Sequence, residues 1–324
     1  MHNFKCLTLL LLTLLSSACS VSIPLFRGEQ PLGEAWLDGQ GKQKILMITV
    51  DGTISSQESK SLLMGNSEST VDAVKSRLDL ARNDDNIVAL ILRVNSPGGG
   101  VTASDTIYHE LARFKAEKKI PVVAFFGDMS ASGGYYISMC ADEIVAQPTT
   151  ITGSIGVIAM YVNVEGLMSK IGVEAQVVRS GKMKAIPNPF ERAGPEQIAW
   201  FQGMINEMYG KFVDTVAAGR KKLTRERIVE LADGRIYTAN QAFGNGLIDR
   251  VGYFEDALAR ARELSGCPDA MLVTYTKNME APNRTVYSSA SAHDAGAIPA
   301  ATALADNLGL LSDGPAFHYL WSPQ

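Results

Sequence analysis

Ser132 and Lys184 are the two residues of this chain whose types and surroundings point most directly to chemistry. Ser132 lies in the small-residue stretch 129–136 (MSASGGYY), and Lys184 lies in the stretch 180–185 (SGKMKA). A serine hydroxyl becomes a nucleophile only when a base takes its proton, and in most serine hydrolases that base is a histidine. The identity of the base is therefore the first question that the sequence raises.

Histidine is scarce in this chain. The sequence has four, of which His2 and His318 lie near the ends and His293 lies in a tail rich in Ala and Ser. His109 remains an alternative base, but it would have to reach Ser132 from the helix that follows a glycine loop. We therefore expect a lysine to take the serine proton.

A lysine acts as a base only where its amine is held neutral. The reference pKa of a lysine is about 10.4, so burial or a nearby positive charge must lower it by several units. Met183, Ala185 and Ile186 offer apolar cover around Lys184, and Lys182 offers the second positive charge. Lys182 also competes for the role of base, because residues two apart on an extended chain share a face. The spacing alone leaves both lysines open.

Glycines follow two of the predicted strands. Gly98, Gly99 and Gly100 come after one strand, and Gly133 follows Ser132 after the next. Glycine leaves backbone N–H groups open to an oxyanion, and ligand sites gather at the carboxyl ends of parallel strands. The simpler interpretations are a tight turn at the glycines and a helix N-cap at Ser132.

The pattern of apolar residues predicts alternating strands and helices. Continuous apolar runs or alternation predict strands at 45–50, 87–94, 121–126, 143–146, 156–164 and 175–179. Helical spacing and capping residues predict helices at 71–82, 102–118, 196–219 and 224–232, and a short one opened by the capping box at Thr238. Strand, helix, strand order favours an α/β fold of parallel βαβ units.

The N-terminus is typical of an exported protein. Residues 1–19 combine Lys5, an apolar run and a small-residue exit at Cys19, and the alternative is an uncleaved membrane anchor. The ending LSSAC resembles a bacterial lipoprotein cleavage box, which makes lipidation of Cys19 an expectation. Residues 20–44 are expected to form a tether between this segment and the folded body.

Composition narrows the classes of partner and cofactor. The net charge of −4 in 324 residues argues against a nucleic-acid partner. Cys140 and Cys267 are expected to be free thiols, with Cys140 in the core. Neither a metal site nor another cofactor is expected, because no Cys/His cluster has ligand spacing. Asp128 and Asp142 flank the Ser132 stretch and are expected to be ordinary surface carboxylates.

Five motifs in order resemble those of the bacterial signal peptide peptidase A family of Ser/Lys serine proteases, peptidase family S49. They are residues 95–100 (NSPGGG), 131–136 (ASGGYY), 152–157 (TGSIGV), 180–184 (SGKMK) and 232–237 (ADGRIY). The resemblance covers roughly residues 45 to 265. It implies a crotonase/Clp-peptidase-like fold of stacked ββα units with a helical C-terminal extension, in a peptidase domain at 45–270 followed by a C-terminal strand and tail at 271–324.

The resemblance also implies roles for single residues. Ser132 matches the nucleophile, Lys184 the general base, and Ser154 the serine that holds the lysine amine. Gly99 or Gly98, together with Gly133, matches the backbone donors of the oxyanion hole. This match favours Lys184 over Lys182.

By the same resemblance, the expected function is endopeptidase cleavage of signal peptide remnants and other small hydrophobic peptides. The site is expected on the extracytoplasmic side of a bacterial membrane, in a homo-oligomeric ring or dome whose neighbouring copies supply serine and lysine. The alternatives are a crotonase-like acyl-CoA hydratase or hydrolase, which the export signal disfavours, and a catalytically silent membrane scaffold. A further hypothesis is that the tail from Pro282 to Gln324, which includes a possible amphipathic helix at 300–311, occupies the peptide groove of its own ring.

Overall fold

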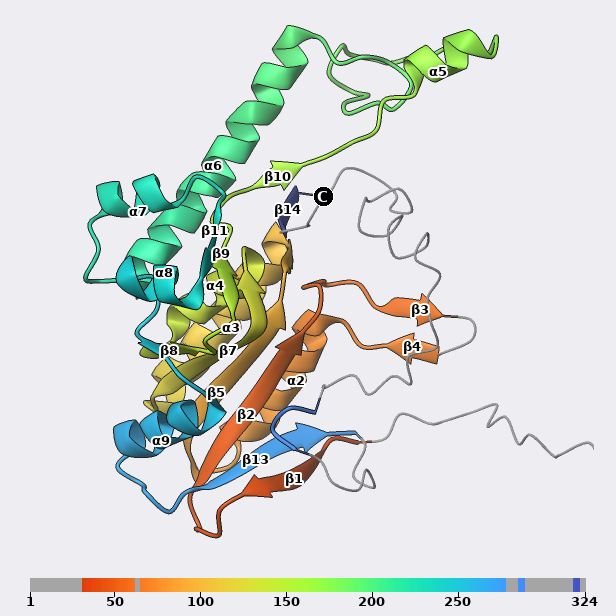
Figure 1. The fold of residues 1–324 in the computed structure, drawn as a ribbon. Helices are drawn as coiled ribbons and strands as arrows, with labels where there is room; N and C mark the ends of the chain where they lie inside the picture. Colours follow the sequence, from red (N-terminus) through yellow and green to blue (C-terminus); the bar gives the residue numbers. More distant parts are fainter. Residues whose placement is uncertain (1–30, 62–64, 278–284, 289–316, 321–324) are drawn as a thin grey trace, which may run out of the picture. The chain divides into compact units, whose positions relative to one another are not determined.

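The computed structural model describes residues 31–61, 65–277, 285–288 and 317–320 (Figure 1). The expected export segment, Cys19 and the tail helix expected at 300–311 lie outside the described residues. The compact unit that holds the site begins at Gly33. Within the described residues, every helix is too short or too polar to cross a bilayer.

The central element is a nine-stranded sheet whose middle strands are parallel (Figure 1). In spatial order its main path is β1 (Gly33–Asp38), β13 (Met271–Thr276), β2 (Lys44–Asp51), β5 (Ile87–Ser96), β7 (Val122–Ala131), β8 (Glu143–Ala146) and β12 (Arg250–Val251). β9 (Ile151–Gly153) pairs with the end of β7, and β11 (Ile236–Thr238) pairs with β9. The parallel order expected from the sequence is confirmed.

Two smaller sheets complete the strands of the described residues. One has the order β10 (Ile158–Ala159), β14 (Phe317–Leu320), β6 (Gly98–Gly100), and the other pairs β3 (Ser59–Ser61) with β4 (Gly65–Ser67). The glycines after β5 therefore form a short strand, where the sequence allowed a simple turn.

Some of the helices begin at a residue whose side chain caps them, and others begin without a side-chain cap. They are α2 (Thr70–Arg82), α3 (Val101–Lys118), α4 (Gly133–Ile137), the 3₁₀ turn η1 (Ser138–Cys140), α5 (Glu165–Lys170), α6 (Pro195–Gly219), α7 (Arg225–Leu231), α8 (Ala239–Gly244) and α9 (Phe254–Ser265). Thr224 Oγ1 caps α7, and Thr238 forms the expected capping box with Gln241 at the start of α8.

One face of the sheet is covered by α9. Alternate residues of β2, β5 and β7 point to this face and pack against the apolar side of the helix. The rings of Phe125 on β7 and Phe254 on α9 meet edge to face at 5.3 Å. This packing fixes the strands whose carboxyl ends carry the glycines and Ser132.

Strand β7 pairs with two different strands along its length. Residues up to Phe126 pair with β8, and residues from Met129 pair with β9. Thr150 Oγ1 donates to the carbonyls of Phe126 and Gly127 at 3.2 and 2.6 Å, which ties the chain at the point of change. The second half of β7 thus carries Ser132 to the end of β9.

Three expectations about elements differ from the structure. β1 lies inside residues 20–44, which were expected to be a tether. Residues 175–179 are not a strand, and of the run 156–164 only Ile158–Ala159 is. The reason in both runs is pairing: apolar alternation makes a strand only where a neighbouring strand accepts its backbone hydrogen bonds.

Candidate active site

Ser132 occupies a sharp turn between a strand and a helix. It follows the last residue of β7 and precedes the five-residue helix α4, with φ 51° and ψ −115°. A non-glycine residue rarely adopts a positive φ, and the conformation costs on the order of 1–3 kcal/mol. The turn is held by the Ser132 N–H, which donates to the Gly153 carbonyl at 2.8 Å, and by the Tyr136 N–H, which donates to the Ser132 carbonyl at 2.8 Å.

The Ser132 side chain does not serve as a helix cap. The residue is 1% exposed, and its Oγ makes no hydrogen bond with any described residue. Buried hydroxyls normally have a partner, because leaving one unpaired costs about 1–3 kcal/mol. An N-cap role would have given this oxygen a backbone N–H, so the simpler interpretation of Ser132 is wrong.

Gly133 lies directly against the glycine strand β6. A Cβ added to Gly133 would lie 3.1 Å from the Gly99 nitrogen, 3.1 Å from the Gly98 Cα and 2.5 Å from Ser104 Oγ. Contacts this short exclude a side chain at this position. The backbone after Ser132 and the backbone of β6 are therefore in contact, as the expected oxyanion hole requires.

Ser154 lies beside Ser132 through strand register. Ala131 pairs with Gly153 in the parallel β7–β9 ladder, so the two serines are the next residues on adjacent strands. Ser154 also has a positive φ of 50° and is 7% exposed, and its N–H donates to the Arg235 carbonyl at 2.8 Å. Two strained serines thus stand side by side at one edge of the sheet.

α4 is braced by residues that the sequence pattern did not single out. Tyr136 Oη donates to Asp105 Oδ1 at 2.6 Å and accepts from Thr215 Oγ1 at 3.1 Å. Its ring also meets that of Phe212 at 5.0 Å. These contacts join α4 to α3 and α6, elements distant in sequence, so local patterns carried no signal for them.

Lys184 is not joined to Ser132 within one chain. Its side chain is exposed and has no hydrogen bond or ion pair among the described residues, while its N–H donates to the Gly181 carbonyl at 2.9 Å. The competing Lys182 has a partner, because its Nζ contacts Glu196 at 2.7 Å. Of the two lysines, Lys184 is the one whose amine is unengaged in this part of the chain.

The remaining candidates have structural roles or lie at the surface. His109 is exposed on α3. Asp128 is exposed and accepts from Asn95 Nδ2 at 3.3 Å. Asp142 accepts from the Val122 N–H at 2.9 Å and pairs with Lys115. Both carboxylates thus match the ordinary roles expected for them.

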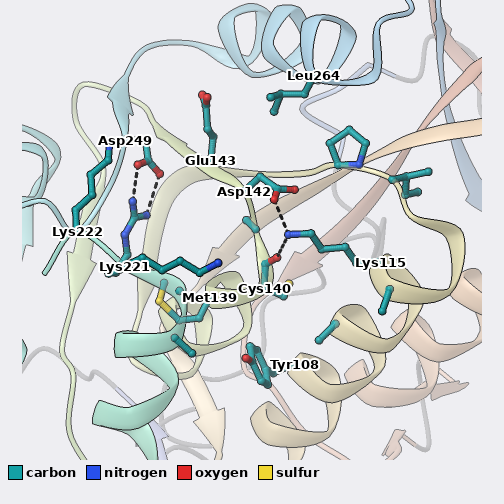
Figure 2. A pocket seen from close by; sticks show the side chains of 18 of the residues that line it. Tyr108, Lys115, Met139, Cys140, Asp142, Glu143, Lys221, Lys222, Asp249 and Leu264 are labelled. Atoms are coloured by element: carbon teal, nitrogen blue, oxygen red, sulfur yellow. Dashed lines mark hydrogen bonds and ion pairs between the residues drawn. The ribbon is translucent and has the colours of Figure 1, made fainter. Parts of the chain in front are cut away.

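A hollow of about 1010 Å³ lies elsewhere on the same unit (Figure 2). Figure 2 shows two sets of interactions among its lining residues: Lys115 Nζ contacts Asp142 and the Cys140 carbonyl, and Asp249 pairs with Arg220. Cys140 is buried there as expected, and desolvation raises the pKa of its thiol to about 12. Ser132 does not line this hollow.

Comparison with known proteins places the chain in a family. The model of the Peptidase family S49 matches residues 114–267. A protein of Enterococcus faecium, provisionally named signal peptide peptidase SppA, is 37% identical over 252 residues, which are 78% of this chain and 72% of that protein. "Serine protease SPPA, chloroplastic" of Arabidopsis thaliana is 34% identical over 232 residues, 70% of this chain and 33% of that protein.

A solved structure is also similar. A ClpP1 point mutant from Listeria monocytogenes aligns with a TM-score of 0.43 and 18% identity, over 65% of this chain and 94% of that one. The family match includes Ser132, Ser154 and Lys184 within its bounds. The chain therefore belongs to peptidase family S49 and is a serine protease.

Proposed function

We propose that the protein is an endopeptidase with a Ser132/Lys184 dyad that closes between two copies of the chain. The observation that carries this proposal is the pair of unmatched groups: a buried, strained Ser132 whose Oγ has no partner among the described residues, and an exposed Lys184 whose amine has none there either. In a symmetric assembly, the serine of one copy can meet the lysine of a neighbouring copy, and each group would then gain the partner that it lacks within its own chain.

The surroundings of Lys184 support a contact with another copy. Residues 158–200, which we call the 158–200 segment, hold eleven of the large apolar side chains that are exposed in the described residues. They are Ile158, Met160, Tyr161, Val162, Leu167, Ile171, Val173, Val178, Phe190, Ile198 and Trp200. Such a concentration of apolar surface is typical of an interface. A cover of this kind would also desolvate the Lys184 amine, which a lysine base requires.

The proposed reaction begins when the neutral amine of Lys184, from a neighbouring copy, takes the proton of Ser132 Oγ. The oxygen attacks the carbonyl carbon of a peptide bond, and the oxyanion is held by the N–H groups of Gly99 and Gly133, with Gly98, next to Gly99 in β6, as the alternative donor. The Lys184 ammonium returns the proton to the leaving amine, which leaves an acyl group on Ser132. Water, deprotonated by Lys184, then releases the second product. Ser154 is proposed to orient the lysine amine.

The substrates that we propose are cleaved signal peptides and other small membrane-associated peptides, reached from the extracytoplasmic side of a bacterial membrane. The support is the export-type sequence of residues 1–19 and the name of the Enterococcus faecium relative. Lipidation of Cys19 is the proposed anchor. A Cys19→Ser chain found in the same membrane fraction as the parent chain would contradict it.

Mixing two inactive chains tests the dyad. Ser132→Ala and Lys184→Ala should each abolish cleavage of a fluorogenic signal-peptide substrate by protein lacking residues 1–19. Co-expressed in equal amounts, they should recover activity at about a quarter of the sites, since random neighbours bring an intact serine to an intact lysine at that frequency. Lys182→Ala is the matched control and should remain active. Recovery of no activity, or full activity of Lys184→Ala alone, would contradict the proposal; an inactive parent chain would favour the scaffold.

A further inference from the structure

The motif at residues 232–237 lies directly beside the two strained serines. Its last two residues open β11, which pairs antiparallel with β9 so that Ile236 is opposite Gly153 and Tyr237 is opposite Thr152. β9 in turn pairs with the end of β7, and Figure 1 shows β11 beside β9. The motif therefore supports, from the outer side, the strand that leads into Ser154.

Two backbone hydrogen bonds in series connect this motif to Ser132. The Arg235 carbonyl accepts from the Ser154 N–H at 2.8 Å, and the Gly153 carbonyl accepts from the Ser132 N–H at 2.8 Å. Gly153 and Ser154 both have a positive φ, of 87° and 50°. Two successive positive φ values make a sharp bend, and a serine keeps such a conformation only where its surroundings hold it. The positions of both serines therefore depend on how firmly the bend is held.

The ring of Tyr237 packs on this bend. A Cβ added to Gly153 would lie 2.6 Å from Cδ2 and 3.2 Å from Cε2 of the ring. An aromatic ring that covers a glycine on a neighbouring strand supplies the packing that the glycine lacks. Tyr237 is 6% exposed, so its ring also shields the Gly153 backbone from water. The bend has no room for a side chain, and the ring blocks its movement toward β11.

The hydroxyl of Tyr237 fixes the ring in this position. Its Oη donates to the Leu231 carbonyl at 2.8 Å, at the C-terminus of α7. The last carbonyls of a helix have no partner within the helix, and this bond satisfies one of them. Tyr237 thus makes two separable contacts, because its ring packs on Gly153 and its hydroxyl binds α7.

We propose that Tyr237 is a positioning residue, whose ring holds Ser132 and Ser154 at the spacing that the proposed dyad needs. It acts through Gly153, whose carbonyl holds one serine and whose peptide bond leads to the other. The inference rests on the proposed function, because it takes Ser132 as the nucleophile and Ser154 as the residue that orients the lysine amine. A shift of the bend would misalign both groups, so the chemical step slows while peptide binding is unchanged.

Three full-length variants separate the ring from the hydroxyl, and both from chain stability. Tyr237→Phe removes the hydroxyl and keeps the ring, whereas Tyr237→Leu removes both. Tyr275→Leu is the matched control, because Tyr275 is similarly buried at 7% exposure. It lies on β13, which β2 and β5 separate from β7. The two leucine variants should therefore lose similar stability, and only one of them should disturb the site.

Tyr237→Leu is expected to lower kcat for a fluorogenic peptide about 10–100-fold and to leave KM within about twofold. The rising limb of its pH–rate profile should move up by about 0.5–1 pH unit, because a hydroxyl that donates to a neutral lysine amine lowers the pKa of that amine. Tyr237→Phe and Tyr275→Leu should keep the kcat and the profile of the parent chain. A merely structural role would lower the Tm of both leucine variants and move neither profile.

Hydrogen exchange reports on the two serines without any cleavage. In Tyr237→Leu the segments 129–136 and 151–157 should exchange at least about tenfold faster than in the parent chain, as mass spectrometry measures, while the other two variants keep their protection. Unchanged exchange would overturn the proposal. So would an unchanged kcat and pH profile in Tyr237→Leu, and the proposed function would survive that result. If exchange accelerates but the parent chain cleaves no peptide, the proposed function fails and the bracing of both serines by Tyr237 stands.

Discussion

The surroundings of Ser132 and the 158–200 segment differ in how completely one chain builds them. From Ser130 to Cys140 every residue is buried, and the turn is held by hydrogen bonds and close glycine contacts. In the 158–200 segment large apolar side chains are exposed, and Val178 is 99% exposed. Under the proposed dyad, the surroundings of Ser132 would be complete in one chain, and the apolar surface around Lys184 would be covered by another copy.

The largest expected difference comes from adding one methyl group next to Ser132 and one in α6 just after the 158–200 segment. Gly133→Ala would place a Cβ 3.1 Å from the Gly99 nitrogen, so we expect it to displace β6 and reduce kcat/KM about 10²–10³-fold, the cost of losing one oxyanion donor. Gly203→Ala, in α6, meets nothing within 4 Å and should stabilise the helix by about 0.5–1 kcal/mol.

Peptidase assays and thermal unfolding of both glycine variants measure this difference. A Gly133→Ala chain with normal activity would show that a Cβ at position 133 fits against β6 without displacing it. Loss of activity in Gly203→Ala without loss of chain stability would instead indicate that another copy covers this part of α6.

The next contrast lies within a single helix. Phe212, near the end of α6, is fully buried against Tyr136, whereas Trp200, near its start, is 54% exposed. Phe212→Ala should lower the free energy of unfolding by about 3–5 kcal/mol. Trp200→Ala should change it by less than about 0.5 kcal/mol in the single chain, since an exposed side chain loses little packing there.

Urea unfolding at a protein concentration too low for assembly measures both values. At higher concentration Trp200→Ala is expected to weaken assembly, which light scattering detects. Equal destabilisation by the two variants in the single chain would mean that the start of α6, at Trp200, is packed as firmly as its end, at Phe212.

Sequence patterns predicted best what neighbouring residues determine. The apolar runs 45–50 and 87–94 became the central strands β2 and β5, and Thr238 caps α8 as expected. Parallel order places the ends of β5 and β7 at one edge of the sheet, which is why the apolar pattern alone could group the glycines with Ser132.

What sequence could not predict depends on partners distant along the chain. Residues 33–38 looked like tether, yet they form β1 because β13 offers an edge to pair with. Residues 175–179 alternate as a strand does but find no neighbour among the described residues. The rest of β7, with Gly127, Asp128 and Ser130, is a strand because β9 and Thr150 hold it there.

The smallest expected effect on the protein is that of a thiol reporter, and it addresses the cover of the 158–200 segment directly. Alkylation requires a thiolate, and desolvation raises the pKa of the Cys140 thiol to about 12, so at pH 8 Cys140 should react about a thousandfold more slowly than an ordinary thiol with a pKa near 8.5. Val178→Cys, in a chain with Cys267→Ser, should react at the ordinary rate in dilute single chains. In assembled protein its alkylation should slow at least several-fold while Cys140 stays protected, as pulse labelling and mass spectrometry would measure. An unchanged rate on assembly would mean that Val178 stays open to solvent, and the cover over Lys184 would then have to come from a different part of the neighbouring copy.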